Sequence, residues 1–279
     1  MREFPSYRSY RDFAFSVSRH WRYARPSDMS DFLETVLATS HDKEEVVPIG
    51  SPVFRAQLGH AWRPETVGEG VTEEFPSAFP PERMKPLPDR AVEGRANPKG
   101  IPCLYVGTHE ETAVAEVRPW IGALVSVARL RTTRALRVVN CTVADHRSRV
   151  YFSEPAPEER QRAVWQDIDR AFSEPVSSSD DVASYAPTQV LAEAFRQSGL
   201  DGVAYRSAVG PGHNIAIFDP AAAELIACGL VEVHRLTLEY SQADNPYFVT
   251  KHLHPKDEGA EQADAADEGA QASTPRPRS

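Results

Sequence analysis

Cysteine is scarce in this sequence, where only Cys103, Cys141 and Cys228 occur among 279 residues. Three widely spaced cysteines do not make a disulfide framework, and they are typical of a reducing cytoplasm. Long apolar runs are also missing, because none approaches the roughly 20 residues that a membrane span needs. The N-terminus has no apolar stretch of the kind found in secretory signals. We therefore expect a cytoplasmic protein without a membrane partner.

A surplus of basic residues is missing as well. The chain has 40 acidic and 31 basic residues, a net charge of −9. Nucleic-acid binders usually carry a basic stripe, so direct nucleic-acid binding is not expected. Dinucleotide and P-loop fingerprints, zinc-protease motifs and serine-hydrolase elbows are absent. His252 and His254 lack cysteine or acidic partners at ligand spacing, so no metal site is predicted.

The pattern along the chain divides it into three parts. Residues 1–50 are expected to form a helical extension, with Ser27 or Ser30 as an N-cap. Its apolar residues recur at helical spacing: Met29, Phe32, Leu33, Val36 and Leu37. Residues 51–240 are predicted to form one α+β domain, and residues 241–279 a largely disordered acidic tail. We expect the extension to pack onto the domain, with a partner surface as the alternative.

The middle part contains both strands and helices. Residues 64–102 are dense in proline and glycine, which predicts a binding loop. A buried strand is expected at 103–106. Thr108 and Glu111 have capping-box spacing, so a helix is expected to begin there and to end before Pro119. Further strands are predicted at 124–130, 136–143, 203–207, 214–218 and 230–238, and further helices at 158–172 and 187–197.

Three residues along this strand and helix suit one chemistry. Arg95 precedes the strand, Tyr105 lies near its end, and Glu116 comes late on the helix. A strand of about five residues rises roughly 17 Å, and about eight helical residues rise roughly 12 Å. A helix packed antiparallel to its strand would return Glu116 toward Arg95. The three side chains are therefore predicted to share one cleft.

The three side chains offer complementary interactions. A guanidinium group pairs bidentately with a phosphate or pyrophosphate. A tyrosine ring stacks on a planar ring and leaves its hydroxyl free to orient it. A carboxylate hydrogen-bonds a ribose hydroxyl and stabilises an oxocarbenium-like transition state. Ser207, at the end of a later strand, is a candidate to hold the carboxylate or to bind ribose or phosphate.

Each residue also has an ordinary structural interpretation. Arg95 has the position of a solvated loop residue, and Tyr105 has that of a core residue in an apolar strand. Glu116 lies among apolar neighbours, where a carboxylate is costly unless it is paired. Arg118 or Arg129 would be its partner under that interpretation.

At these residues the sequence resembles the RES domain family, which is named for its arginine, glutamate and serine. The family's central motif is similar to the run GRANPKGIPCLYVGTHEETAVAEVRP, and its second region is similar to YAPTQVLAEAFRQSGLDGVAYRSAVGPGHNIAIFDP. The resemblance places the family's arginine on Arg95, its tyrosine on Tyr105, its glutamate on Glu116 and its serine on Ser207.

Two further positions fit the family pattern. Phe54-Arg55 resembles the start of the family's domain, which makes Arg55 a candidate for a second phosphate contact. Asn214 also fits, as a candidate binding residue to which no separate role is assigned.

The resemblance implies a fold similar to diphtheria-toxin-like ADP-ribosyltransferases, with a split β core, surrounding helices and NAD⁺ in the cleft. It implies that NAD⁺ is a substrate whose nicotinamide–ribose bond is broken, with inorganic phosphate or water as the acceptor and without a metal. RES proteins commonly act as bacterial toxins. A helix-turn-helix antitoxin of the Xre type neutralises them by blocking the NAD⁺ site.

Two other functions remain compatible with the same residues. An ADP-ribosyltransferase would use this site with a protein or nucleotide as acceptor. A non-catalytic module would only sense NAD⁺ or bind a partner, and Glu116→Gln would leave its effect unchanged. An enzyme would instead keep binding and lose turnover in that variant.

Overall fold

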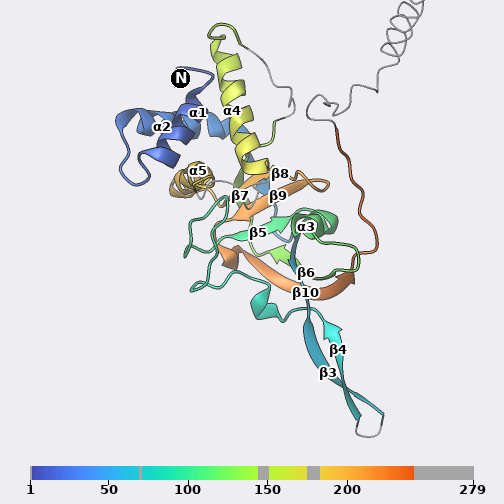
Figure 1. Ribbon diagram of the computed structural model, residues 1–279. Helices are drawn as coiled ribbons and strands as arrows, with labels where there is room; N and C mark the ends of the chain where they lie inside the picture. Colours follow the sequence, from blue (N-terminus) through green and yellow to red (C-terminus); the bar gives the residue numbers. More distant parts are fainter. Residues whose placement is uncertain (1, 69–70, 144–150, 175–182, 242–279) are drawn as a thin grey trace, which may run out of the picture. The chain divides into compact units, whose positions relative to one another are not determined.

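The computed structural model describes residues 2–68, 71–143, 151–174 and 183–241 (Figure 1). It contains an eight-stranded sheet with the strand order β1-β7-β8-β9-β5-β2-β6-β10. The strands of this sheet are β1 (Glu44–Val47), β2 (Pro52–Leu58), β5 (Leu104–Gly107), β6 (Leu124–Thr132), β7 (Leu136–Asn140), β8 (Gly202–Arg206), β9 (His213–Ile217) and β10 (Ala223–Glu232). Neighbouring strands are antiparallel except β7 and β8, which are parallel. The large mixed sheet with helices confirms the predicted α+β class.

Most of the helices group together over one part of the sheet, and α3 lies apart from them (Figure 1). The helices are α1 (Ser9–Arg19), α2 (Ser27–Ser40), α3 (Glu110–Glu116), α4 (Pro157–Ser173) and α5 (Ala186–Gln197). Buried side chains of α1, α2, α4 and α5 share one apolar core with β7, β8 and β9. The short helix α3 packs instead against β2, β5 and β6. This separation leaves α3 free to form one wall of a site over the centre of the sheet.

Apolar cores lie on both faces of the sheet, because successive side chains of a strand point to opposite sides. Along β8, Val203 and Tyr205 belong to the core under the helices, whereas Ala204 belongs to the other core. Strand β9 repeats this alternation, with Ala216 on the helical side. Phe79, which lies outside the strands of the sheet, also belongs to the second core. Burial on both faces explains why the central strands are so apolar.

Residues 1–50 contribute to the main core and the main sheet. The apolar side chains expected to share one helix face belong to α2, and Met29 and Val36 are fully enclosed. Pro26 precedes this helix, and no side chain caps it, so neither Ser27 nor Ser30 serves as the expected N-cap. The segment is not wholly helical, because Glu44–Val47 forms strand β1 and pairs with β7.

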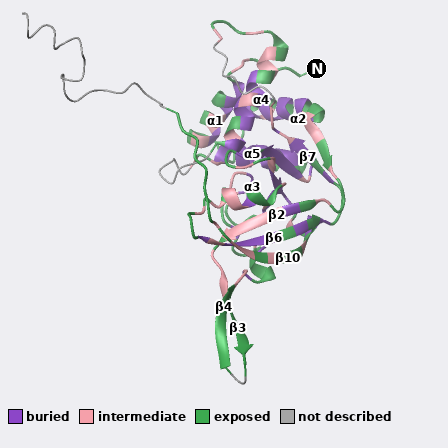
Figure 2. Cartoon of the chain, turned by 90° about the vertical axis from the view of Figure 1, so that its right-hand side faces the viewer, coloured by how far each residue is buried: buried purple, intermediate pink, exposed green. Residues whose placement is uncertain are grey.

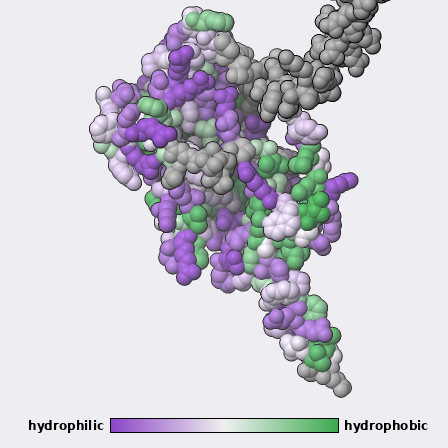
Figure 3. Space-filling model, in the orientation of Figure 1, coloured by the Kyte–Doolittle hydropathy of each residue, from purple (hydrophilic) through white to green (hydrophobic). Residues whose placement is uncertain are grey.

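The proline- and glycine-rich segment contains a hairpin that we did not predict. Strands β3 (Ala61–Val67) and β4 (Val71–Ser77) pair with each other and not with the main sheet. Both strands are largely exposed (Figure 2). Apolar side chains therefore remain on the surface of the hairpin (Figure 3), namely Trp62, Val67, Val71 and Phe75. Because neither face is buried, the sequence lacks the alternation that would have revealed these strands.

Other predicted elements agree with the structure to different degrees. The helices predicted at 158–172 and 187–197 are confirmed by α4 and α5. The last strand is β10, which begins at Ala223, well before the predicted start at 230. Residues 242–279, where an acidic tail is expected, lie outside the described part of the chain. Within the described part, no helix has the length and apolar character to cross a bilayer.

Candidate active site

A cavity of about 200 Å³ lies between α3 and the centre of the sheet. Its walls come from β2, β5, β8, β9 and α3, which lie far apart in the sequence. The lining residues are Phe54, Arg55, Ala56, Tyr105, Val106, Gly107, Ala113, Glu116, Val117, Tyr205 and Asn214. The cavity thus combines a carboxylate, a guanidinium, an amide and two phenol rings.

Glu116 is the last residue of α3 and is exposed on the side of the cavity. Its Oε1 accepts one hydrogen bond from the Ser207 hydroxyl at 2.8 Å and another from Nδ2 of Asn214 at 2.5 Å. No ion pair joins Glu116 to Arg118 or Arg129 among the described residues. Two neutral donors therefore hold the carboxylate in place.

The start of α3 differs from the capping box that the sequence predicted. His109 is the N-cap residue, and no side chain caps the helix. The Thr108 hydroxyl instead accepts the backbone N–H of His213 at 3.0 Å. A long-range contact with the strand that carries Asn214 has replaced the local cap. The consequence is a direct connection between the beginning of α3 and strand β9.

Tyr105 has its ring in the cavity and its hydroxyl in the loop that precedes β5. The hydroxyl donates to Oδ1 of Asn97 at 2.7 Å and accepts the N–H of Ala96 at 2.8 Å. The hydroxyl is therefore not free to orient a ligand, although the sequence suggested that it would be. Burial raises the pKa of Tyr105 far above its usual value, so the phenol stays protonated at neutral pH. Tyr105 nevertheless lines the cavity.

Asn97 organises this loop from a buried position. Its Nδ2 donates to the carbonyls of Val92, Pro98 and Ile101 while its Oδ1 holds Tyr105. Sequence reasoning assigned no role to it. Its place in the Gly-Arg-x-Asn run was the one signal in the sequence that could have pointed to this role.

Gln189 of α5 and Gly94 complete the support of the loop. Nε2 of Gln189 donates to the carbonyls of Gly94 and Asn97 at 3.0 and 3.1 Å. A Cβ atom at Gly94 would lie 2.5 Å from the Tyr105 hydroxyl, so glycine is the residue that permits this close approach. These contacts fix the loop against both the helical layer and the cavity wall.

Arg95 does not line the cavity with Tyr105 and Glu116, although the sequence placed the three in one cleft. Its guanidinium donates to the carbonyl of Ala171 at 3.0 Å and to that of Glu174, both at the end of α4. This geometry satisfies helix carbonyls that lack intrahelical partners. Arg95 is nevertheless near enough to the cavity to lower the pKa of Tyr105 and oppose the effect of burial.

Arg55 is the arginine that lines the cavity. One guanidinium nitrogen donates to the carbonyl of Tyr105 at 3.4 Å, and its Nε is buried without a hydrogen-bond partner. Burial lowers the pKa of Arg55, but an arginine remains protonated under physiological conditions. A buried cation with an unsatisfied donor is costly unless an anionic or strongly polar group meets it.

Comparison with known families gives one match. A family model described as the RES domain matches residues 60–239, which is more than half of the chain. The chain belongs to the RES domain family. Among solved structures, one chain of the M. tuberculosis MbcT–MbcA toxin–antitoxin complex is similar, with 14% identity and a TM-score of 0.38 over 71% of this chain and 92% of that chain. No curated protein matches the chain.

The matched part of this RES domain includes most of the candidate residues, with Arg55 five positions before its start at residue 60. Tyr205 also lines the cavity, although the sequence analysis assigned it no role. Its pKa is raised by burial, is lowered again by Arg95, and is raised further by Glu116. The part of the RES domain that the structure describes holds no cluster of metal-ligating side chains.

Proposed function

We propose that this RES domain breaks the nicotinamide–ribose bond of NAD⁺ and transfers the ADP-ribosyl group to inorganic phosphate or water. The observation that carries the proposal is the Glu116 carboxylate, held by Ser207 and Asn214 beside the ring of Tyr105 and the cation of Arg55. A carboxylate in this position is suited to stabilise positive charge on a ribose carbon.

The size of the cavity indicates which end of NAD⁺ it accepts. Pockets for drug-sized ligands measure about 300–1,000 Å³, whereas this cavity measures about 200 Å³. It therefore suits the nicotinamide riboside end, with the adenosine end outside. The nicotinamide would stack on Tyr105, and the pyrophosphate would contact Arg55 at the cavity and Arg95 beside it. The arrangement would be that of a diphtheria-toxin-like ADP-ribosyltransferase.

The bond breaks between C1″ of the ribose and the nicotinamide nitrogen. The electron pair of this bond moves to the nicotinamide, which leaves as a neutral molecule and needs no general acid. Glu116 stabilises the oxocarbenium-like ribose, and a phosphate oxygen or a water oxygen then bonds to C1″. The products are nicotinamide with ADP-ribose-1″-phosphate, or nicotinamide with ADP-ribose and a proton.

A direct assay distinguishes the possible acceptors. The full-length chain is incubated with NAD⁺, with and without phosphate, and the products are identified by mass spectrometry. Glu116→Gln should retain NAD⁺ binding and lose turnover, whereas Glu111→Gln, on the same helix but outside the cavity, should behave like the parent. Phosphate-dependent ADP-ribose-1″-phosphate indicates a phosphorylase, and ADP-ribose under both conditions indicates a hydrolase. Intact NAD⁺ in every sample would overturn the proposal in favour of ADP-ribosyl transfer to an absent acceptor or of binding alone.

Depletion of NAD⁺ would make this chain a toxin, and we extend the proposal to that role. A toxin of this kind requires a neutralising partner, for which a helix-turn-helix antitoxin that covers the Glu116 cavity is our candidate. Induced expression in bacteria should stop growth and lower cellular NAD⁺, and Glu116→Gln should do neither. Growth arrest without a fall in NAD⁺ would contradict this role.

A further inference from the structure

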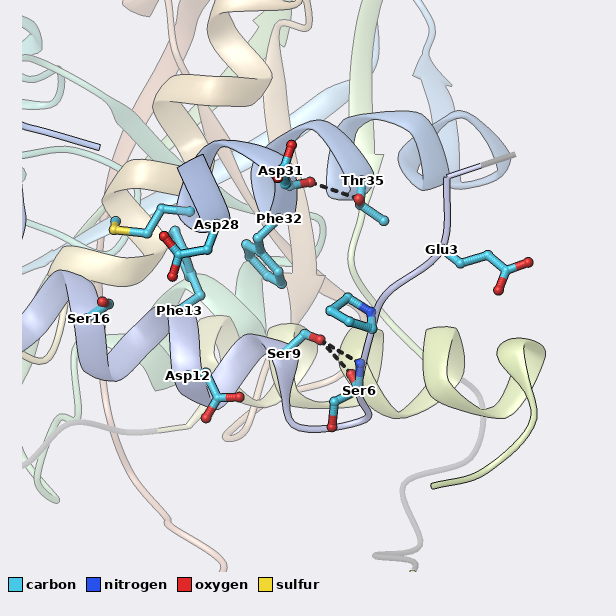
Figure 4. A pocket seen from close by; sticks show the side chains of 12 residues that line it. Glu3, Ser6, Ser9, Asp12, Phe13, Ser16, Asp28, Asp31, Phe32 and Thr35 are labelled. Carbon is cyan, nitrogen blue, oxygen red and sulfur yellow. Dashed lines mark hydrogen bonds between the residues drawn. The ribbon is translucent and has the colours of Figure 1, made fainter. Parts of the chain in front are cut away.

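A second and larger cavity lies outside the NAD⁺ site, in the helical layer. It measures about 480 Å³ and is a groove between the N-terminal segment, α1 and α2 (Figure 4). In the close view, Ser16 and Asp28 lie toward one end of the groove, and Ser6 and Thr35 toward the other. The two helices therefore run side by side in opposite directions along its length.

The floor of the groove is apolar. Phe13 from α1 and Phe32 from α2 stack with their ring centroids 4.5 Å apart, and Met29 lies beside them. The space-filling view shows that hydrophilic side chains dominate the surface of the helical layer (Figure 3). An apolar floor within such a surface is suited to hold an apolar side chain of a ligand.

The rim of the groove is acidic. Among the residues that the structure describes, its charged lining residues are Glu3, Asp12, Asp28 and Asp31, with no lysine, arginine or histidine. Three of the four hydroxyl groups that line the groove donate within the chain. Ser6 donates to Glu154, Ser9 to the carbonyl of Ser6, and Thr35 to that of Asp31. Charge is therefore the main preference of the rim.

Two of these carboxylates have no cation of their own. Asp31 lies 3.8 Å from Arg2, and Glu3 lies 3.1 Å from Arg160. Asp12 and Asp28 form no ion pair with any residue in the described ranges. Each lies in the first turn of its helix, where the helix dipole favours an acid. The dipole explains their presence on the helices but leaves both facing the groove as free acceptors.

The length of the groove favours an elongated ligand. The lining residues of α1 extend from Ser9 to Ser16, and those of α2 from Asp28 to Thr35. Seven helical steps correspond to roughly 10 Å, or two turns of a helix. A helix laid along the groove would contact residues at both of its ends.

We propose that this groove binds a basic amphipathic helix of a partner protein. An apolar side chain of that helix contacts Phe13, Met29 and Phe32, and its lysine or arginine residues pair with Asp12 and Asp28. A second copy of this chain is disfavoured because the chain carries a net charge of −9. The chain's own segment 242–279 is disfavoured as well, because it contains seven acidic and four basic residues. Anionic lipid would be repelled for the same reason.

Binding of short model peptides to the full-length chain tests this proposal. Three fluorescently labelled peptides are compared by anisotropy: a helix with leucines on one face and lysines on the other, the same peptide with glutamates for lysines, and a lysine peptide with its leucines scrambled. We expect the first to bind most tightly and the glutamate peptide not to bind. We also expect hydrogen exchange to slow in α1 and α2 when the first peptide is present.

Two charge variants separate the groove from general attraction to an acidic protein. Asp12→Asn with Asp28→Asn should weaken binding of the lysine helix roughly tenfold, because two ion pairs are lost. Glu73→Gln with Glu74→Gln changes the net charge equally on the β3–β4 hairpin and should have little effect. Hydrolysis or phosphorolysis of NAD⁺ should be unchanged in both, so this test is independent of the proposed function. Equal weakening by both variants, equal binding of the scrambled peptide, or no binding at all would overturn the proposal.

Discussion

The hydroxyl of Ser207 lies 2.8 Å from Oε1 of Glu116 and also accepts the backbone N–H groups of Val209 and Gly210. This hydroxyl therefore connects the turn after β8 to the end of α3. Ser207→Ala removes one of two donors to the carboxylate and leaves two N–H groups without this acceptor. We expect turnover of NAD⁺ to fall by roughly 10- to 100-fold and stability to fall by about 1 kcal/mol.

Steady-state kinetics and urea unfolding of Ser207→Ala check this prediction. Ser198→Ala is a suitable control because the Ser198 hydroxyl donates to the carbonyl of Phe195, at the end of α5, and Ser198 does not line the cavity among the described residues. If Ser207→Ala keeps full turnover, Asn214 alone is enough to position Glu116.

Asn214 offers a test that depends on pH. Its Nδ2 lies 2.5 Å from Oε1 of Glu116, so Asn214→Asp places two carboxylates in one site. Like charges at this distance raise the pKa of one member of the pair. At low pH the introduced carboxyl group is protonated and can donate to Glu116 as the asparagine does, and at high pH repulsion displaces the glutamate. We expect the activity of this variant, relative to the parent, to rise as the pH falls. A pH–rate profile parallel to that of the parent would show that Asn214 does not orient Glu116.

The two arginines should respond differently to replacement by lysine. Arg55 lines the cavity with a buried, unpartnered Nε, whereas Arg95 is bonded to the carbonyls of Ala171 and Glu174. Arg55→Lys should raise the KM for NAD⁺ by more than about tenfold, because a single ammonium cannot reproduce bidentate contact with a phosphate. Arg95→Lys should raise KM less and also lower stability by about 1 kcal/mol. Kinetics and thermal unfolding of both variants distinguish the roles, and the opposite ranking of KM values would make Arg95 the main phosphate contact.

Gly94 should tolerate alanine poorly because of Tyr105. The new Cβ would lie 2.5 Å from the tyrosine hydroxyl, whereas nothing lies within 4 Å of a Cβ added at Gly229, which makes Gly229→Ala the matched control. We expect Gly94→Ala to cost about 1–3 kcal/mol of stability. The cost should be smaller in the Tyr105→Phe background, since the clashing oxygen is then absent. Urea unfolding of the four combinations gives this coupling energy, and strict additivity would show that the loop moves without strain.

The sequence indicated some parts of this site because their signals are local. The strand with Tyr105 and the helix with Glu116 are neighbours in the chain, and both residues line the cavity. Helix α4 was found because its apolar residues keep one helical spacing, and α5 was found from the proline near its start and Gly199 just past its end. Phe172 and Phe195, each fully enclosed, lie on the buried faces of these two helices.

Other parts depend on long-range contacts that no local pattern contains. Arg95 bonds to carbonyls 76 and 79 positions later in the chain, and Thr108 contacts His213 105 positions away. Because of these contacts, Arg95 does not face the cavity as expected, and Thr108 does not form the expected capping box. The hairpin β3–β4 was missed for the opposite reason, since exposure on both faces removes any period-two pattern.

The burial of several thiol and phenol groups predicts that alkaline pH destabilises the protein. Burial raises the pKa of Cys103 from the usual 9 to about 12, and it raises those of Tyr105 and Tyr205 as well. Above pH 9 the unfolded chain releases protons that the folded chain retains. The free energy of unfolding should therefore be constant well below pH 9 and fall progressively as the pH rises toward 12. Each group contributes up to about 1.4 kcal/mol per pH unit in this window.

Urea unfolding at a series of pH values measures this decline, and Cys103→Ala should make it less steep. Thiol accessibility gives an independent check, because Cys103 and Cys141 are buried while Cys228 is only half-buried. A thiol reagent at pH 8 should therefore label Cys228 first in the native protein, and the other two only after unfolding. Fast labelling of Cys103 in the native protein would mean that the segment before β5 opens readily, and it would contradict the burial from which the alkaline decline is derived.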